Sequence, residues 1–537
     1  MRFYFIIPLH KTFFSALCLS LLFTFSVKAQ TAATSSPYSR FALGRPENTG
    51  FASITAMGGS FTAFRNDTTD RSTFFINQGN PSSYAFNKYT SYEFGARYAY
   101  YTFSGKDGDV KKQNGGFNYI SLCFPIRKKM GAAFGHVPFS NVGYNVTTTE
   151  NVDSIGNITN NYQGAGGINQ VYGGVAYRPF EAAYRNYLKS KAYKQLDSIA
   201  KNDTSRSKAA LAKIRRKKFI ANSLNNFSIG TNVSFLYGTI NYSTRKYFPA
   251  SFGSVFNTCD YTETQLHDVY VQGGTQISFD INYGKRRRVI RIDTICYNVN
   301  GDVTEKKPCC DGTGKTAYRL KKIYGEKKLV SLKNKTKITV GYTASLPKAV
   351  SASATHVGYN FTLASFGREI PFDTFSYDPN FKGRVYIPFM QTLGIGIKHG
   401  EMFTFLADVG YQQWSKFQFL GTSQGLKDQW RFSGGIQYQP SKMAIGTGAF
   451  FRRIMYRAGA RYNTGYLFLK GSQINEYAVS AGLGLPVGKY RVGTMINITA
   501  EYGVAGTTKN LLVQEHFLRF VIGCTFNSAW FQKTRYD

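Results

Sequence analysis

The stretch INITAEYGV, residues 496–504, decides the fold class of this chain. Apolar and polar residues alternate along it without a break: Ile496, Ile498, Ala500, Tyr502 and Val504 against Asn497, Thr499, Glu501 and Gly503. Successive side chains of a β-strand point to opposite faces of the sheet. The stretch is therefore predicted to be a strand with one apolar and one polar face.

The same alternation returns at 431–439, 456–466 and 518–526. A soluble β-sandwich alternates in this way, and so does a transmembrane barrel. The barrel also explains runs of about 9–11 residues or more and a polar face turned to a wet lumen. It further explains the aromatic content of 16%, with 45 Phe and 38 Tyr, because barrels carry aromatic girdles at both membrane interfaces. We therefore expect an all-β transmembrane antiparallel barrel.

The first 29 residues have the pattern of a cleavable signal peptide. A weakly basic start that includes Arg2 and Lys11 precedes the apolar stretch 12–27, and Ala29 ends a cleavage site that leaves Gln30 first. An uncleaved helix is the alternative. Leu17 before Cys18 argues against a lipid anchor. No run of 18 apolar residues follows, so no membrane-spanning helix is expected. Export combined with a barrel predicts the outer membrane of a Gram-negative bacterium.

Counting the alternating runs gives an even number of strands, as single-chain bacterial barrels require. Residues 89–537 form the expected barrel, and both of its ends face the periplasm. The fourteen expected strands are 89–104, 116–126, 130–150, 158–180, 226–246, 264–284, 336–358, 385–398, 402–417, 429–439, 454–470, 475–487, 492–505 and 515–526.

Two basic insertions, 181–225 and 285–335, interrupt the barrel pattern, and both are expected on the periplasmic side. The first contains AAYRNYLKSKAYKQLDSIA (182–200), which is typical of a helix, followed by the basic run 215–218. The second begins with the basic run 285–288. They are either solvated loops or a docking surface for an acidic protein partner or polyanion.

The formal net charge of +36 is extreme. Nucleic acid is the usual partner of so basic a chain, but an exported protein rarely meets it. Outer-membrane lipid, lipopolysaccharide or an acidic protein fits the location better.

The cysteines that follow the signal peptide favour no metal site. Cys123 and Cys524 fall in expected strands and Cys259 in a loop. Cys296 shares a basic insertion with Cys309 and Cys310, where a disulfide is one outcome in an oxidising periplasm. Zinc is disfavoured there because no histidine lies in the segment.

Residues 30–88 carry no long alternating run, but their many Phe residues argue against disorder. The order of several motifs here and further along resembles the FadL-like outer-membrane transport family, in the form common in Bacteroidetes. The motifs are SPYSRFALG (36–44), Ala56-Met57-Gly58-Gly59, Asn66-Asp67, Asn80-Pro81-Ser82, PFSNVGYNV (138–146), GGINQVYGGVAYRP (166–179), YQQWSKF (411–417), MYRAGARYNTGYL (455–467), EYGVAGT (501–507) and FNSAWFQKTRYD (526–537). Ser82 replaces the family's usual Ala.

The resemblance implies that residues 30–88 form a hatch inside the lumen, with Met57, Gly58, Gly59, Asn80 and Pro81 as its motif. It also implies uptake of hydrophobic small molecules, which leave through a lateral gap in the wall.

The candidate lateral gate lies in the third strand, where Gly135, Pro138 and Gly143 interrupt the run. Pro138 cannot donate a ladder hydrogen bond and would open the sheet locally. A bulge without any role in transport is the alternative.

No phosphate loop, zinc motif or nucleophile arrangement is visible, so neither an enzyme nor a cofactor is predicted. The expected inward-facing charges are Asp408, Arg431, Arg457, Arg461, Glu501 and Arg519. Pairing with one another and with the hatch is favoured over a catalytic or anion-binding cluster.

Two functions remain open. The first is uptake of hydrophobic compounds, which the hatch-like segment and the kinked third strand favour. The second is a non-transporting barrel subunit of a larger outer-membrane secretion or barrel-assembly complex. The basic insertions motivate the second function, because a simple transporter does not need them.

Overall fold

The computed structural model describes most of the chain after the expected signal peptide. The described residues are 34–47, 50–66, 75–106, 108–153, 155–180, 182–202, 207–249, 255–283, 289–297, 303–304, 317–324, 334–400, 402–441, 449–487 and 494–528. The signal peptide predicted at 1–29 lies outside them.

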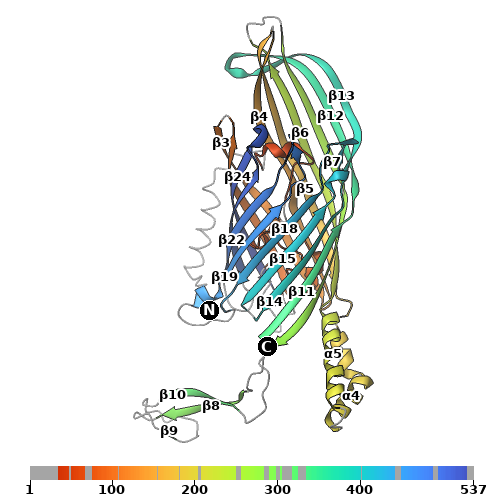
Figure 1. The fold of residues 1–537 in the computed structure, drawn as a ribbon, viewed down its shortest axis with the longest axis vertical. Helices are drawn as coiled ribbons and strands as arrows, with labels where there is room; N and C mark the ends of the chain where they lie inside the picture. Colours follow the sequence, from red (N-terminus) through yellow and green to blue (C-terminus); the bar gives the residue numbers. More distant parts are fainter. Residues whose placement is uncertain are drawn as a thin grey trace, which may run out of the picture.

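The described residues form a closed antiparallel β-barrel of fourteen strands, as predicted (Figure 1). The first strand pairs with the last from Thr90 opposite Ser528 to Ser104 opposite Gln514, which closes the wall. The wall strands are β2 (Thr90–Gly105), β3 (Gly108–Arg127), β4 (Met130–Val152), β5 (Gly156–Tyr177), β6 (Ser228–Tyr247), β7 (Asn257–Tyr283), β11 (Asn334–Ser345) with β12 (Lys348–Leu363), β13 (Glu369–Ile387) with β14 (Met390–His399), β15 (Phe403–Gln412), β18 (Gln429–Tyr438), β19 (Met455–Asn463), β22 (Glu476–Val487), β23 (Thr494–Gly506) and β24 (Gln514–Ser528).

Two of the fourteen strands are each interrupted by a proline. β11 and β12 both pair with β7 and are separated by Leu346 and Pro347. β13 and β14 pair with β12 and β11 and are separated by Pro388 and Phe389. Proline has no N–H to donate to the ladder. It therefore breaks the pairing, while the chain continues in the same direction.

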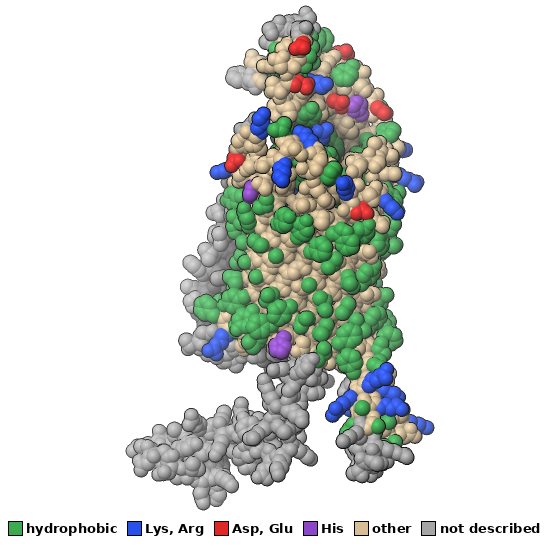
Figure 2. All heavy atoms as spheres, in the orientation of Figure 1, with side chains coloured by type: hydrophobic (Ala, Val, Ile, Leu, Met, Phe, Trp, Pro, Cys, Tyr) green, Lys and Arg blue, Asp and Glu red, His purple; other side chains and the backbone are tan. Residues whose placement is uncertain are grey.

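The alternation in β23 sets which face is buried. Asn497, Thr499 and Glu501 are at most 1% exposed, whereas Ile498 and Tyr502 are 39% and 48% exposed. The polar face thus points into the barrel and the apolar face points out. Figure 2 shows the result, a broad band of hydrophobic side chains around the outer wall.

We call the end at which β2 begins and β24 ends the terminal end, and the opposite end the far end. Both basic insertions connect strands at the terminal end. The first forms α3 (Ala183–Lys189), α4 (Lys191–Asn202) and α5 (Ser207–Asn225), which extend below the wall in Figure 1. The second contains a small antiparallel sheet of β8 (Val289–Tyr297), β9 (Val303–Thr304) and β10 (Ala317–Tyr324). The helix α6 (Ala449–Arg453) follows β18 at the same end.

In the described residues, the far-end connections contain short elements. They are η3 (Ser365–Gly367), η4 (Trp414–Lys416), β16 (Gln418–Phe419), β17 (Thr422–Ser423), β20 (Phe468–Leu469), β21 (Ser472–Gln473) and η5 (Lys509–Leu511).

Several strands are longer than the sequence pattern predicts, and one prediction is wrong as a result. Cys259, expected in a loop, lies in β7, which begins at Asn257 rather than at 264. Beyond the membrane a strand no longer needs a clean apolar face, so its alternation fades there while its backbone pairing continues. The helical prediction for 182–200 holds for α3 and α4, and the basic run 215–218 lies within α5.

The described parts of the N-terminal segment, 34–47, 50–66 and 75–88, run inside the barrel through η1 (Pro37–Arg40), β1 (Arg45–Pro46), α2 (Ala52–Thr55) and η2 (Pro81–Phe86). Four of its large apolar side chains, Phe51, Ile54, Met57 and Tyr84, are completely buried. They form one cluster with inward-facing residues of the wall such as Tyr119. The core of the molecule thus lies between this segment and the inner wall.

Candidate functional site

Gly58 and Gly59 of the predicted hatch motif lie in close contact with the wall. Both have positive φ angles, +68° and +78°. A Cβ atom at Gly58 would lie 2.4 Å from the carbonyl oxygen of Ala460, so only glycine fits against β19. The Gly58 N–H donates to Ser480 Oγ at 3.2 Å, which joins the turn to β22. Met57 is completely buried beside them.

Asn80 and Pro81, the other half of that motif, begin η2. Asn80 Oδ1 accepts hydrogen bonds from the Ser82 N–H and hydroxyl at 3.2 and 2.8 Å, and its Nδ2 donates to the Thr62 carbonyl at 2.7 Å. The wall residues opposite them are glycines, whose lack of a side chain leaves room for the segment. A Cβ atom on Gly274 would lie 2.2 Å from Asn80 Oδ1, and one on Gly230 would lie 2.6 Å from Pro81 C.

Two of the six expected inward charges hold the backbone of the N-terminal segment. Asp408 Oδ2 accepts from the N–H groups of Phe61 and Thr62 at 2.8 and 2.9 Å. Arg431 donates to the carbonyl of Gly59 at 2.9 Å. These two side chains therefore position the segment rather than face open solvent.

Three other expected charges form a buried chain across β19, β23 and β24. Glu501 accepts from Arg461 through one carboxylate oxygen and from Arg519 through the other, the latter at 2.9 Å. Arg457 stands apart from this chain and donates to Gln437 and Asn497 at 2.8 and 2.7 Å.

The buried ion-pair network is larger than the residues that the sequence pattern singles out. Arg461 also pairs with Glu476 at 2.8 Å. Arg45, in β1 of the N-terminal segment, pairs with Glu476 at 2.8 Å and with Glu515. The sequence pattern could have identified Glu515 as an inward-facing charge, because Glu515 lies in the expected strand 515–526 at a position that faces the same side as Arg519. Arg45 carried no comparable signal, since β1 is only two residues long.

A second ion pair ties the N-terminal segment to β2. Glu47 Oε2 lies 2.6 Å from Arg97 Nη1, and Asn141 donates to the other oxygen of Glu47 at 2.9 Å. Burial by itself would raise the pKa of Glu47, but Arg97, Arg519 and the hydrogen bonds from Arg97 and Asn141 outweigh it and lower the pKa to about 2. The carboxylate is therefore charged at neutral pH.

A small polar cavity of about 100 Å³ lies within this network. The charged side chains Arg45, Glu47, Arg461, Glu476 and Glu515 line it, together with Tyr38 and Tyr466 among others. This volume holds a few water molecules and no more.

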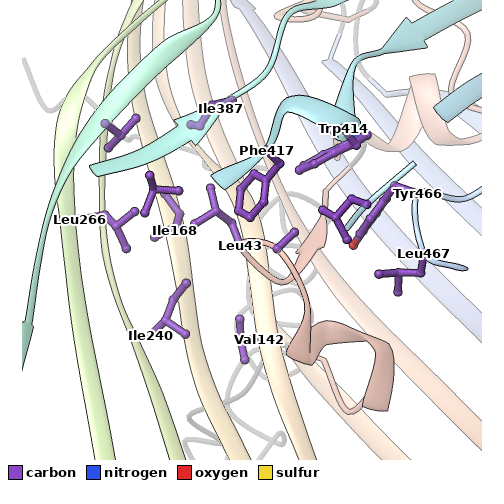
Figure 3. Packing of buried hydrophobic residues seen from close by; sticks show 14 of the residues in the cluster. Leu43, Val142, Ile168, Ile240, Leu266, Ile387, Trp414, Phe417, Tyr466 and Leu467 are labelled. Atoms are coloured by element: carbon purple, nitrogen blue, oxygen red, sulfur yellow. The ribbon is translucent and has the colours of Figure 1, made fainter. Parts of the chain in front are cut away.

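On the far-end side of the network lies an apolar region, which we call the far-end cluster. It joins Ala42 and Leu43 of the N-terminal segment to inward-facing wall residues and to far-end loop residues (Figure 3). Figure 3 labels Leu43, Val142, Ile168, Ile240, Leu266, Ile387, Trp414, Phe417, Tyr466 and Leu467 of this cluster.

The expected lateral-gate residues Gly135, Pro138 and Gly143 lie at the point where β3 and β4 separate. In the described parts of these strands, pairing runs only from Arg127 opposite Met130 to Ile120 opposite His136. Beyond it the β4–β5 register shifts between Pro138 and Ser140.

The N-terminal segment occupies the free edge of β4 beyond that point. In β1, Arg45 pairs with Asn141 and Pro46 with Ser140, and the Glu47 N–H donates to the Phe139 carbonyl at 3.0 Å. Gly143 exchanges hydrogen bonds with Ser39 Oγ. We call this arrangement the β3–β4 seam: the wall ladder stops, and the N-terminal segment replaces it.

Within the described residues, no group of three or more His, Cys, Asp or Glu side chains is placed to hold a metal ion. Nor does any helix in the described ranges combine the length and apolar character needed to cross a membrane. Cys123, Cys259 and Cys524 are free thiols. The proposed pairing of Cys296 with Cys309 or Cys310 involves side chains outside the described part of the chain.

Comparison with known proteins gave one family match. The family model described as BamG matches residues 10–184 and 320–537. The stretch that it leaves unmatched includes α4 and α5. The search of the curated proteins found no match.

Solved structures gave more distant likenesses. The P. putida toluene transporter TodX is 13% identical with a TM-score of 0.47, covering 88% of this chain and 97% of its own. The Ralstonia pickettii toluene transporter TbuX is 12% identical with a TM-score of 0.44, covering 89% and 98%. A Pseudomonas aeruginosa FadL homologue is 11% identical with a TM-score of 0.44, covering 90% and 98%.

Proposed function

The chain belongs to the BamG family, and from this premise we propose that it is an outer-membrane barrel that takes up hydrophobic small molecules through a lateral opening. The outer face of the described wall supports the membrane location. Phe134, Val233 and Leu393 are 52%, 50% and 56% exposed on it, whereas Asn232 and Ser234, on either side of Val233, are at most 1% exposed. Water would not stabilise such a surface, whereas a bilayer would.

The β3–β4 seam is the observation that carries the proposed uptake. A closed ladder offers no way out of the lumen, because breaking a wall leaves backbone groups without partners in lipid. Beyond the end of the β3–β4 ladder, the N-terminal segment holds the edge of β4 through the two residues of β1, the Glu47 N–H and Ser39 Oγ. Displacement of this segment therefore opens the wall there without separating two wall strands.

The path to the seam is apolar. Leu43 and Val142 of the far-end cluster lie on the N-terminal segment and on β4, close to the residues that pair across the seam. A hydrophobic molecule that enters from the far end contacts this cluster before it meets the charged network below. The arrangement favours lateral exit into the bilayer over passage along the full length of the lumen.

A reversible cross-link tests this function. The double variant Pro46→Cys/Ser140→Cys places two cysteines at paired positions of β1 and β4, at a separation that a disulfide spans. We expect the oxidised variant to lose uptake of a labelled long-chain fatty acid and of a labelled monoaromatic hydrocarbon, and a reductant to restore it. The matched control, Thr404→Cys/Gln437→Cys, staples β15 to β18 away from the seam.

The control variant should take up both labelled compounds whether its disulfide is oxidised or reduced. Uptake by the oxidised seam variant at the wild-type rate, with the disulfide verified by mass spectrometry, would refute the lateral route. Equal uptake by cells with and without the gene, across both classes of compound, would refute uptake altogether.

A second function has an observation of its own. β12 and β13 are among the strands that rise highest at the far end of the wall (Figure 1). Phe372, Phe375 and Tyr377 on β13 are 68%, 56% and 65% exposed there. Contiguous exposed aromatics on a folded surface are typical of a protein interface. They favour a subunit of a larger outer-membrane assembly, the role that the basic insertions also suggest.

Purification in mild detergent distinguishes the two functions. If the chain is a subunit, it co-purifies with a defined partner, and Phe372→Ser/Tyr377→Ser loses that partner while keeping a folded barrel. Phe117→Ser, which removes an exposed aromatic from β3, is the control. Recovery of the wild-type barrel alone would exclude a stable complex.

A further inference from the structure

The last turns of α5 are fixed to the base of the wall. The ring of Phe219 stacks on that of Phe279 in β7, with centroids 6.0 Å apart and planes 17° apart. Asn222 Nδ2 donates to Asp280 Oδ2 at 2.8 Å. The orientation of these turns relative to the barrel is therefore set by specific contacts.

The outer apolar surface of the barrel continues onto this end of the helix. Phe219, Ile220 and Leu224 are 45%, 47% and 37% exposed. Close by on the strands that flank the insertion, Tyr177 and Ile229 are 41% and 48% exposed. The apolar outer surface of the wall thus continues onto the last turns of α5.

Exposed cations precede these apolar residues in the sequence of α5 and lie about one turn further from the barrel. Lys213, Arg215, Arg216 and Lys217 are all exposed. Arg215 and Arg216 precede Phe219 and Ile220 by four residues, so each cation lies about 6 Å below an apolar side chain on the same helix face. Figure 2 shows basic side chains gathered immediately below the green band of the wall.

Acidic residues do not neutralise these cations within the helix, since α5 contains neither Asp nor Glu. Lys218 is used differently, because its ammonium group lies 4.9 Å from the ring centroid of Tyr193 in α4. The four exposed cations therefore have no acidic neighbour within α5. We call them, together with Phe219, Ile220 and Leu224, the α5 foot.

We propose that the α5 foot binds the phosphate groups of anionic phospholipids in the leaflet that meets the terminal end of the barrel. The apolar residues of the α5 foot lie at the level expected for the acyl chains of a leaflet. Its cations lie one turn further out, at the level expected for the phosphates. An acidic protein would need the cations but would not need them in register with the lipid-facing band. The inference rests on the membrane location proposed above, and not on transport.

Native mass spectrometry of the full-length detergent-solubilised protein tests the site. The protein is titrated with phosphatidylglycerol and, separately, with zwitterionic phosphatidylcholine. Each cation near a phosphate-rich surface contributes about 1 kcal/mol, which corresponds to about fivefold in affinity. We expect Lys213→Gln/Arg215→Gln/Arg216→Gln/Lys217→Gln to weaken phosphatidylglycerol retention at least about tenfold.

Two matched proteins accompany this variant. Lys111→Gln/Lys112→Gln/Lys382→Gln/Arg384→Gln removes four exposed cations from β3 and β13 toward the far end and should retain the lipid. Arg215→Lys/Arg216→Lys keeps the charge and should also retain it. Heat-modifiable gel mobility checks that every variant contains a folded barrel. The comparison of the two lipids on the wild-type protein still tests the proposal if the neutral variant does not fold.

Three results would overturn the proposal. They are equal retention of phosphatidylglycerol by both quadruple variants, equal retention of the two lipids by the wild type, and loss of lipid from the Arg-to-Lys variant. A fourth result would reassign the surface to a protein: an acidic partner that leaves the quadruple α5 variant while its lipid retention stays unchanged.

Discussion

Replacing Arg45 by Met should release the N-terminal segment from the barrel without unfolding the wall. Arg45 bridges Glu476 and Glu515, and the Glu515 side chain is fully buried. Removing one partner of a buried ion pair costs about 3–5 kcal/mol, because a buried charge is left uncompensated. Glu476 keeps Arg461, and Glu515 keeps a hydrogen bond from Ser36 Oγ at 2.6 Å. The lower value, about 3 kcal/mol, is therefore expected.

Hydrogen–deuterium exchange followed by mass spectrometry measures this effect locally, because exchange reports the free energy of opening of each segment. A loss of about 3 kcal/mol speeds exchange about 100-fold in peptides from residues 36–47. Peptides from β15 and β18 should exchange as in the wild type.

Two further variants test whether the buried ion pair of Arg45 holds the N-terminal segment. Arg45→Met/Glu515→Gln removes both charges, and most of the protection should return. Arg384→Met, at an exposed position of β13, controls for the loss of one positive charge. If Arg45→Met exchanges no faster than Arg384→Met, the ion pair does not hold the segment. If peptides 36–47 exchange faster in the double variant than in Arg45→Met, the uncompensated charge of Glu515 does not cause the loss of protection.

Two other predictions concern the same segment. Because the pKa of folded Glu47 is lowered to about 2 from an ordinary value of 4.5, its ion pair stabilises the segment fully above about pH 4.5 and is lost as the pH falls toward 2. Exchange of peptides 36–47 should therefore accelerate over that range in the wild type and change less in Glu47→Gln; identical pH profiles would contradict the assignment. Gly58→Ala forces a Cβ into the Ala460 carbonyl and should lower the thermal midpoint of the segment by several degrees, whereas Gly173→Ala, with nothing within 4 Å, should not.

The wall could be predicted from sequence because its signal is local. The alternation at 496–504 sets which face points outward, and the same signal repeats often enough to give the number of strands. It fades toward the far end of β13: residues 369–384 are exposed or half-buried on both faces, so no periodic pattern marks them. The sequence pattern therefore started this strand at 385 rather than at 369.

The contacts inside the lumen could be predicted only in part. Glu501 and Arg519 stand on neighbouring strands at inward positions, so their pairing follows from the strand count. Arg45 and Glu515 are 470 positions apart, and one of them lies in a segment without periodicity. Nothing local connects such residues. Their contact depends on where closure of the whole barrel places β1.

The distance along the chain between these partners also constrains the order of assembly. The Ser36 hydroxyl finds Glu515 across 479 positions, and Thr90 meets Ser528 only when the wall closes. Contacts of such high sequence separation form late, because a very long loop must close before they contribute. The N-terminal segment is thus synthesised before the barrel strands and is among the last parts of the chain to acquire its partners. Until then its many phenylalanines stay unburied, and the chain needs protection from aggregation over that interval.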